Sequence, residues 1–294
     1  MTNSISKQLA PTRIEEMDRW GRDEIYSEMR SLLDEDRAIA LDLINHGLTA
    51  VDDELDSSDS PLPRLYHYEE LFTRAYSGIP LETETKTEET IVELGQRLSE
   101  LDSIDQTAKQ SLGMITYHQV LAFWQAEKRN LDRRWGLLSQ NSLDHLATDI
   151  GSTVALQFLY ILDPSLNSTK FEIIGGVYGL AVKLADNLCD FKADIHQGFI
   201  NIPEESIHHV SGITIINNRV TQVNPEDLLL SRVYLEQEYS RVEENFDKAT
   251  ELLANEMLAR PHWDCHTAKK LGLFVKFCES WLEQSKEFIA TKTK

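Results

Sequence analysis

The sequence predicts an all-α protein, and three observations lead to that class. Glycine and proline are scarce, with 13 Gly and 8 Pro among 294 residues. Most long segments repeat apolar residues every three or four positions, which is the period of a helix with one buried face. Short polar segments that contain Gly, Pro or Ser separate these repeats, at residues 57–63, 78–80, 82–90, 163–168 and 198–203.

The repeats predict the helices in chain order. They are expected over residues 13–30, 34–56, 64–77, 88–100, 104–128, 140–162, 169–197, 225–258 and 265–290. One stretch differs, because Gly212–Val223 alternates β-branched residues around Asn217-Asn218, which is typical of a β-hairpin. We therefore expect one domain over residues 1–294, with a small hairpin flap near 212–223.

The charge balance of the chain excludes some classes of partner. Against 29 Lys and Arg stand 49 Asp and Glu, which gives a formal net charge of −20. A nucleic-acid backbone needs clustered cations, and anionic lipid headgroups repel an acidic surface, so neither partner is expected. An anionic ligand such as a diphosphate would need a metal cation between itself and the protein.

The remaining composition predicts a soluble, cytoplasmic protein. The three cysteines have no CxxC spacing, and the first 13 residues lack the apolar stretch of a signal peptide. The longest near-apolar run, Ile150–Leu162, is too short to cross a bilayer.

A first acidic cluster ends the helix expected over 34–56. Asp52 and Asp56 are four residues apart and share a helix face, with Asp53 beside them. Negative charge is unfavourable at a helix C-terminus, and a bound cation would reverse that penalty. The alternative is a solvated acidic helix end.

A second acidic cluster lies in the helix expected over 169–197. Asp186, Asp190 and Asp194 recur at i, i+4 and i+8 beside a stripe of leucines. Carboxylate oxygens suit Mg²⁺, which completes its octahedron with water and substrate phosphates. Lys183, one turn earlier, could meet a phosphate directly. The alternative is an exposed face on which Asp186 and Asp190 form salt bridges with Lys183 and Lys192.

Four segments resemble the squalene/phytoene synthase family of head-to-head trans-prenyl transferases. They match the family's first helix pair with its aspartate-rich motif, the W-x-x-x-L-x-x-A-Y-x-G-x-P segment, the small-residue helix and the second motif, L-x-L-Q-L-x-N-I-x-R-D-x-x-x-D-x-x-x-G-R-I-Y-L-P. In this chain they are residues 32–56, 68–80, 150–162 and 179–203. The chain is similar to a divergent member of that family from about residue 20 to 260.

The resemblance implies an isoprenoid-synthase bundle around a central apolar cavity, with the two motifs facing each other across its mouth. It implies Mg²⁺-assisted ionisation of an allylic C15 or C20 prenyl diphosphate. Asp52, Asp53, Asp56, Asp186, Asp190 and Asp194 would bind metal, and Asp52, Asp56, Asp190 and Asp194 would also be catalytic. Lys183, Asn187, Tyr26 and Arg22 would bind substrate. An apolar product would leave through transient membrane contact.

Departures from the family pattern keep three functions open. The S-K-S-F stretch aligns with Asp23–Tyr26, and the Arg and Tyr of G-R-I-Y-L-P align with Phe199 and Asn201. The first and favoured function is condensation of two substrates, as in squalene/phytoene synthases, although the loss of cations weakens it. Asp186 stands where the motif has Asn, which brings the triad closer to that of class I terpene synthases. The second function is therefore cyclisation of one substrate. The third is a silent homologue that serves as a partner or lipid-binding subunit.

Overall fold

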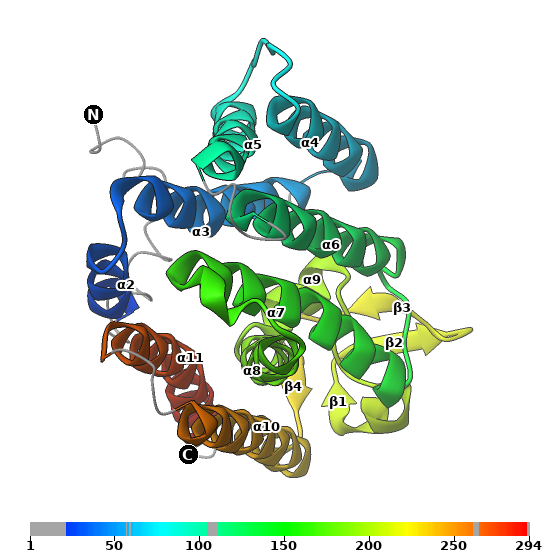
Figure 1. Cartoon of the computed structure of the whole chain (residues 1–294). Helices are drawn as coiled ribbons and strands as arrows, with labels where there is room; N and C mark the ends of the chain where they lie inside the picture. The colour runs from blue at the N-terminus through cyan, green and yellow to red at the C-terminus, as the bar shows by residue number, and fades with distance from the viewer. Residues whose placement is uncertain (1–21, 57, 59, 105–110, 261–264, 293–294) are drawn as a thin grey trace. The chain divides into compact units, whose positions relative to one another are not determined.

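The computed structural model describes residues 22–56, 58, 60–104, 111–260 and 265–292. Within these ranges most residues are helical and the strands are short, so the predicted all-α class with a small hairpin is confirmed (Figure 1). Two compact units divide the chain, at residues 1–124, 156–168 and 262–280 for the first and 125–155, 169–261 and 281–294 for the second. The single domain expected from the sequence stays a prediction.

In its described part, the first unit contains helices and loops but no strand. Its complete helices are α2 (Arg22–Ser31), α3 (Glu35–Asp56), α4 (Pro61–Tyr76), α5 (Lys86–Ile104) and the short 3-10 helix η2 (Pro164–Leu166). It also takes the first part of α6 (Leu112–Asp132), the end of α7 (Gln140–Leu162) and the first part of α11 (Cys265–Lys292).

The core of the first unit forms where α3, α4 and α5 pack on one another. Leu41, Leu65 and Phe72 are fully buried there, and the Phe72 ring meets Trp124 edge-on at 5.0 Å between centroids. Gly95 permits a close approach of α5 to α4, because a Cβ at this position would lie 2.7 Å from the Phe72 carbonyl oxygen.

The second unit holds the remaining elements. These are α8 (Thr169–Cys189), α9 (Phe191–Gln197), η3 (Glu204–His209), β1 (Val210–Ser211), β2 (Ile213–Ile216), β3 (Arg219–Val223), β4 (Leu229–Leu230) and α10 (Arg232–Ala259), with the rest of α6, α7 and α11. Helix α8 packs along α10, where Tyr178 meets Phe246 edge-on and its hydroxyl lies 3.1 Å from Thr250 Oγ1.

The predicted hairpin is present as the antiparallel pair β2–β3. Its two turn residues, Asn217 and Asn218, have φ angles of 51° and 59°, as a type I′ turn requires. Residues between α6 and α7 hold the hairpin, because the amide of Val220 donates to the Trp135 carbonyl oxygen and the amide of Leu137 donates to that of Asn218.

Two of the predicted helices differ from the structure. The helix expected over 169–197 breaks at Asp190, which separates α8 from α9. The helix expected over 225–258 begins only after Ser231, because the Ser231 side chain caps α10 by accepting a hydrogen bond from the Tyr234 amide. The preceding residues, Leu229–Leu230, form β4, which pairs with β1. Parts of the helices expected over 13–30 and 104–128 lie outside the described residues.

Candidate functional site

The first acidic motif occupies the last turn of α3, in the first unit. Asp52 is half-buried and Asp53 is exposed. Asp56 is the last residue of the helix, and its side chain lies outside the described residues. The motif is therefore at a helix C-terminus, as the sequence predicts.

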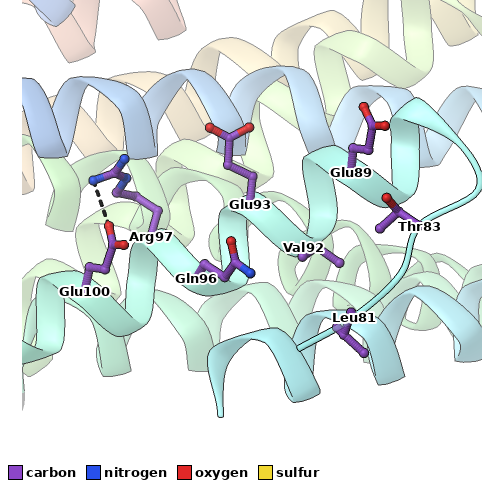
Figure 2. A pocket seen from close by; sticks show the side chains of 8 residues that line it. All are labelled: Leu81, Thr83, Glu89, Val92, Glu93, Gln96, Arg97 and Glu100. Carbon is purple, nitrogen blue, oxygen red and sulfur yellow. Dashed lines mark ion pairs between the residues drawn. The ribbon is translucent and has the colours of Figure 1, made fainter. Parts of the chain in front are cut away.

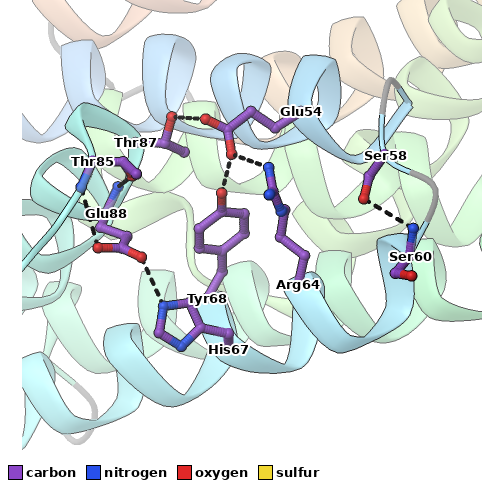
Figure 3. A network of polar contacts seen from close by, with 9 residues as sticks. All are labelled: Glu54, Ser58, Ser60, Arg64, His67, Tyr68, Thr85, Thr87 and Glu88. Atoms are coloured by element: carbon purple, nitrogen blue, oxygen red, sulfur yellow. Dashed lines mark hydrogen bonds and ion pairs between the residues drawn. The ribbon is translucent and has the colours of Figure 1, made fainter.

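Glu54, within the same motif, is held by neighbouring helices. Tyr68 donates to its carboxylate, as do Arg64 at 3.1 Å and Thr87 at 2.7 Å (Figure 3). The three donors come from α4 and α5. The Glu54 carboxylate thus links α3 to α4 and α5. Glu54 therefore has a structural role, although it directly follows Asp52 and Asp53, which are candidate metal ligands.

Two hollows are described on the first unit, and most of the residues that line each of them have polar or charged side chains. One, of about 470 Å³, contains the Glu54 network and the ion pair of His67 with Glu88 at 2.8 Å (Figure 3). The other, of about 420 Å³, lies along α5 and includes Glu89, Glu93 and Glu100 (Figure 2). Carboxylates in this number would repel a diphosphate. Neither hollow is the apolar cavity expected from the sequence, which stays a prediction.

Two predicted substrate ligands, Arg22 and Tyr26, lie on α2 and are occupied by protein groups. The buried Arg22 guanidinium donates to the Ser280 hydroxyl at 2.9 Å and to its carbonyl oxygen at 3.3 Å. The Tyr26 hydroxyl donates to Asp42 at 3.0 Å, which also accepts from Arg30 at 2.8 Å. These contacts join α2 to α11 and α3, and the substrate role stays a prediction.

The second acidic motif spans the break between α8 and α9, in the second unit. The amide of Asp190 donates to the Asp186 carbonyl oxygen and that of Asp194 to the Asp190 carbonyl oxygen, each at 2.9 Å. Helical spacing therefore continues through the break and keeps the three aspartates on one side. Asp190 is exposed, whereas Asp186 and Asp194 are half-buried.

Lys183 is the cation of this motif. Its ammonium group donates to Asp186 Oδ2 at 2.7 Å, and the side chain is 25% exposed. Burial opposes its charged form, but the carboxylates of Asp186 and Asp194 outweigh burial and raise the pKa of Lys183. Lysine and aspartate thus share the site, as the sequence-based alternative of a salt bridge also predicts.

The carboxyl group of Asp194 is strongly perturbed by its surroundings. Burial raises the pKa of Asp194 to about 7, and the charges of Asp186 and Asp190 add to that effect, although Lys183 and an amide donor from Asn201 lower it. A nearby cation would stabilise the ionised form of such a buried carboxyl group. Strongly perturbed pKa values of this kind are common at functional sites.

Sequence reasoning missed two residues of this site, Asn201 and Arg133. Asn201 donates to Asp194 Oδ2 at 2.7 Å, and Arg133, which directly follows α6, donates to Asn201 Oδ1. The only local signal was that Asn201 replaces the tyrosine of the family motif. Nothing near Arg133 in the sequence marks it, because 68 positions separate it from Asn201.

The chemistry of this donor set fits a divalent cation such as Mg²⁺. All three aspartates offer oxygen, and among the described residues Oδ1 of Asn187 is buried without a hydrogen-bond donor. In the part of the chain that the structure describes, no three His, Cys, Asp or Glu side chains gather closely enough to hold an ion alone. Mg²⁺ does not require such a group, because it usually binds through one or two carboxylates, substrate phosphates and water.

Comparison with known proteins supports the fold. No protein-family model and no curated protein matches the chain. A solved structure of a cucumene synthase variant is similar, with a TM-score of 0.61 over 97% of this chain and 91% of that chain, at 11% sequence identity. The chain therefore has an all-α fold like that of a terpene synthase.

None of the described helices is long and apolar enough to span a membrane.

Proposed function

We propose that the protein is a Mg²⁺-dependent isoprenoid synthase that ionises an allylic C15 or C20 prenyl diphosphate. The observation that carries this proposal is the stripe of Asp186, Asp190 and Asp194, in a chain whose fold matches a synthase of cucumene over nearly its whole length. The aspartate stripe alone would not identify the function, because acidic helix faces are common. The fold match alone would not do so either, because one fold hosts many functions.

The residues of the second unit have distinct proposed roles. Asp186, Asp190 and Asp194, with Asn187 Oδ1, are the candidate ligands, of which one or two would hold the cation together with substrate phosphates and water. Lys183 would donate to a diphosphate oxygen. Mg²⁺ held by these residues would neutralise the negative charge that develops on the leaving diphosphate. The allylic C–O bond breaks, its electron pair leaves with the diphosphate, and an allylic carbocation remains. The released diphosphate is the base that accepts a proton from that cation.

The residues of the first unit have a parallel role. Asp52, Asp53 and Asp56 are the second set of metal ligands, as the resemblance to prenyl transferases implies. Glu54 is left out, because three protein donors already occupy its carboxylate.

Conversion of a single substrate is the favoured reaction. The similarity to a cucumene synthase supports it, as does the aspartate at position 186. Condensation of two substrates is the second candidate, supported by the four squalene/phytoene-synthase-like segments in matching order. The lost cations at Asp23–Tyr26 and Phe199 argue against condensation, because two diphosphates must be bound.

One assay tests the proposal and separates these reactions. The protein is incubated with farnesyl or geranylgeranyl diphosphate, with and without Mg²⁺, and the extracts are analysed by mass. We expect Mg²⁺-dependent products with an unchanged carbon number, whereas a doubled number would indicate condensation. Asp190→Ala should abolish turnover, and Asp247→Ala, at an exposed position of α10, should not.

Two outcomes would contradict the proposal. Absence of diphosphate release under every condition would favour the silent homologue. Full turnover by Asp190→Ala would show that the stripe on α8 and α9 is not the metal-binding motif, even if the protein is a synthase.

A further inference from the structure

The segment after α9 is clamped by residues of the turn that follows α6, within the second unit. The Trp135 amide donates to the Gly198 carbonyl oxygen at 2.7 Å, and Arg133 Nη1 donates to the Ile200 carbonyl oxygen at 2.9 Å. The Arg134 guanidinium lies over the Phe199 ring, 4.7 Å from its centroid. The arginine of the G-R-I-Y-L-P pattern aligns with Phe199 in this chain. Arg133 and Arg134, from another part of the chain, lie beside this position.

Arg133 has a second contact that determines how Asn201 is oriented. Arg133 Nε donates to Asn130 Oδ1 at 3.0 Å, and Nη2 donates to Asn201 Oδ1. A guanidinium only donates, so the amide group that faces it must present its oxygen. The NH₂ group of Asn201 must then point the other way, where it donates to Asp194 Oδ2 at 2.7 Å.

The chemical nature of Asn201 matters for Asp194. Lys183 neutralises the carboxylate that it contacts, whereas an amide donor orients a carboxylate without cancelling its charge. Asp194 is therefore held in one orientation, and the charge of its ionised form is left for a bound cation to balance. Ligand carboxylates at metal sites are commonly held in this way by a second residue.

We propose that Arg133 is a positioning residue, which fixes Asn201 and through it the Asp194 carboxylate for binding a divalent cation. The inference rests on the proposed function, because it takes Asp194 as a metal ligand. The contrasting possibility is that Arg133 only fastens residues 198–201 to the turn that follows α6, as its bond to Ile200 would by itself. The two differ in their consequences for cation affinity.

Titration with Mn²⁺, followed by electron paramagnetic resonance in the presence of inorganic diphosphate, separates them. We expect the Mn²⁺ dissociation constant to rise tenfold or more in Arg133→Met and in Asn201→Leu. The double variant should be no weaker than the weaker single variant, because both substitutions break one chain of contacts. Arg133→Lys should recover only part of the affinity, since a lysine lacks the planar fork that reaches two acceptors.

Two further variants keep the test sound if Arg133→Met does not fold. Asn201→Ser removes the amide donor to Asp194 but leaves the Arg133–Ile200 bond, so it should lower Mn²⁺ affinity with little change in the urea midpoint. Arg134→Met loosens the same segment without touching Asn201, so its Mn²⁺ affinity should equal that of the wild type.

The outcomes distinguish this proposal from the proposed function. Wild-type protein that binds no Mn²⁺ would overturn both. Wild-type protein that binds Mn²⁺, with Asn201→Ser and Arg133→Met of unchanged affinity, would overturn only the positioning role. Equal losses in Arg134→Met and Asn201→Ser would do the same, because they would show a general effect of the clamp.

Discussion

Gly151 and Gly179 bring the backbones of α7 and α8 into direct contact. A Cβ at Gly151 would lie 2.0 Å from the Gly179 carbonyl oxygen, and one at Gly179 would lie 2.3 Å from that of Gly151. These distances are shorter than any real Cβ contact, so the helices must separate to accept a side chain. The pair therefore sets the spacing of α7 from the helix that carries the second acidic motif.

Gly179→Ala should lower the free energy of unfolding by about 3 kcal/mol, because overpacking against rigid backbone cannot be relieved by rotamer changes. Gly176→Ala on the same helix is the matched control. Its Cβ would be 3.9 Å from that of Ser152, and alanine is favoured over glycine in helices by about 1 kcal/mol. Urea midpoints should fall for the first variant and rise slightly for the second. Equal midpoints would contradict the contact.

Much of the fold could be predicted because its signals are local. Helical periodicity placed α3, α7 and the start of α11 within a residue or two, and the Asn217-Asn218 pair marked the hairpin turn. The start of α10 was wrong because Pro225 and the residues after it continue a helical apolar pattern, while the capping bond of Ser231 sets the actual boundary.

The candidate site was predictable only in part. The i, i+4, i+8 spacing placed three aspartates and Lys183 together because all lie on one helical stretch. The contacts of Asn201 with Arg133 depend on tertiary structure, so no spacing rule could reveal them. Similarly, only the contacts of Glu54 with α4 and α5 separate it from the neighbouring Asp53.

Asp53 and Glu54 should therefore respond differently to amide substitution. Asp53→Asn should lower turnover at least tenfold and change the free energy of unfolding by less than about 0.5 kcal/mol, since the side chain is exposed. Glu54→Gln should lower that free energy by about 1–2 kcal/mol, because it weakens bonds to a charged acceptor. Its Mg²⁺ dependence should be unchanged. Turnover and chemical denaturation measure both effects, and a reversed pattern would exchange the two roles.

Lys183 should contribute to substrate binding beyond its ion pair with Asp186. Lys183→Met should raise KM for farnesyl diphosphate about tenfold, because it removes a cation that would meet the diphosphate. Lys192→Met is the control, at a half-buried position of α9 with the same side-chain type. Steady-state kinetics should show an unchanged KM for this control. If KM is also unchanged in Lys183→Met, the lysine is only the partner of Asp186.

Asp163 should contribute to stability in a pH-dependent way. Burial disfavours its charged form, but donors from Thr267 and Ser165 and the charge of Lys270 outweigh burial and lower the pKa of Asp163. A carboxyl whose pKa is lower in the folded state stabilises the protein above its unfolded pKa, and this contribution is lost as the pH falls below about 4. Asp163→Asn should cost about 1 kcal/mol at pH 7. In urea melts, the difference from wild type should shrink between pH 5 and pH 3, and a constant difference would exclude the charge as its cause.

Gln157 presents the clearest buried polar group without a partner in the described part of the chain. Its side chain is fully buried in α7, and within the described ranges neither its amide oxygen nor its amide nitrogen has a hydrogen bond. Such a group costs about 1–3 kcal/mol, which an apolar residue of similar size would recover. Gln157→Leu should therefore raise the free energy of unfolding by about 1 kcal/mol, measured without ligand by urea denaturation, with Gln157→Glu as the destabilised counterpart. If Gln157→Leu is instead less stable than wild type, an internal water must satisfy the amide, because polar atoms in protein interiors are otherwise paired.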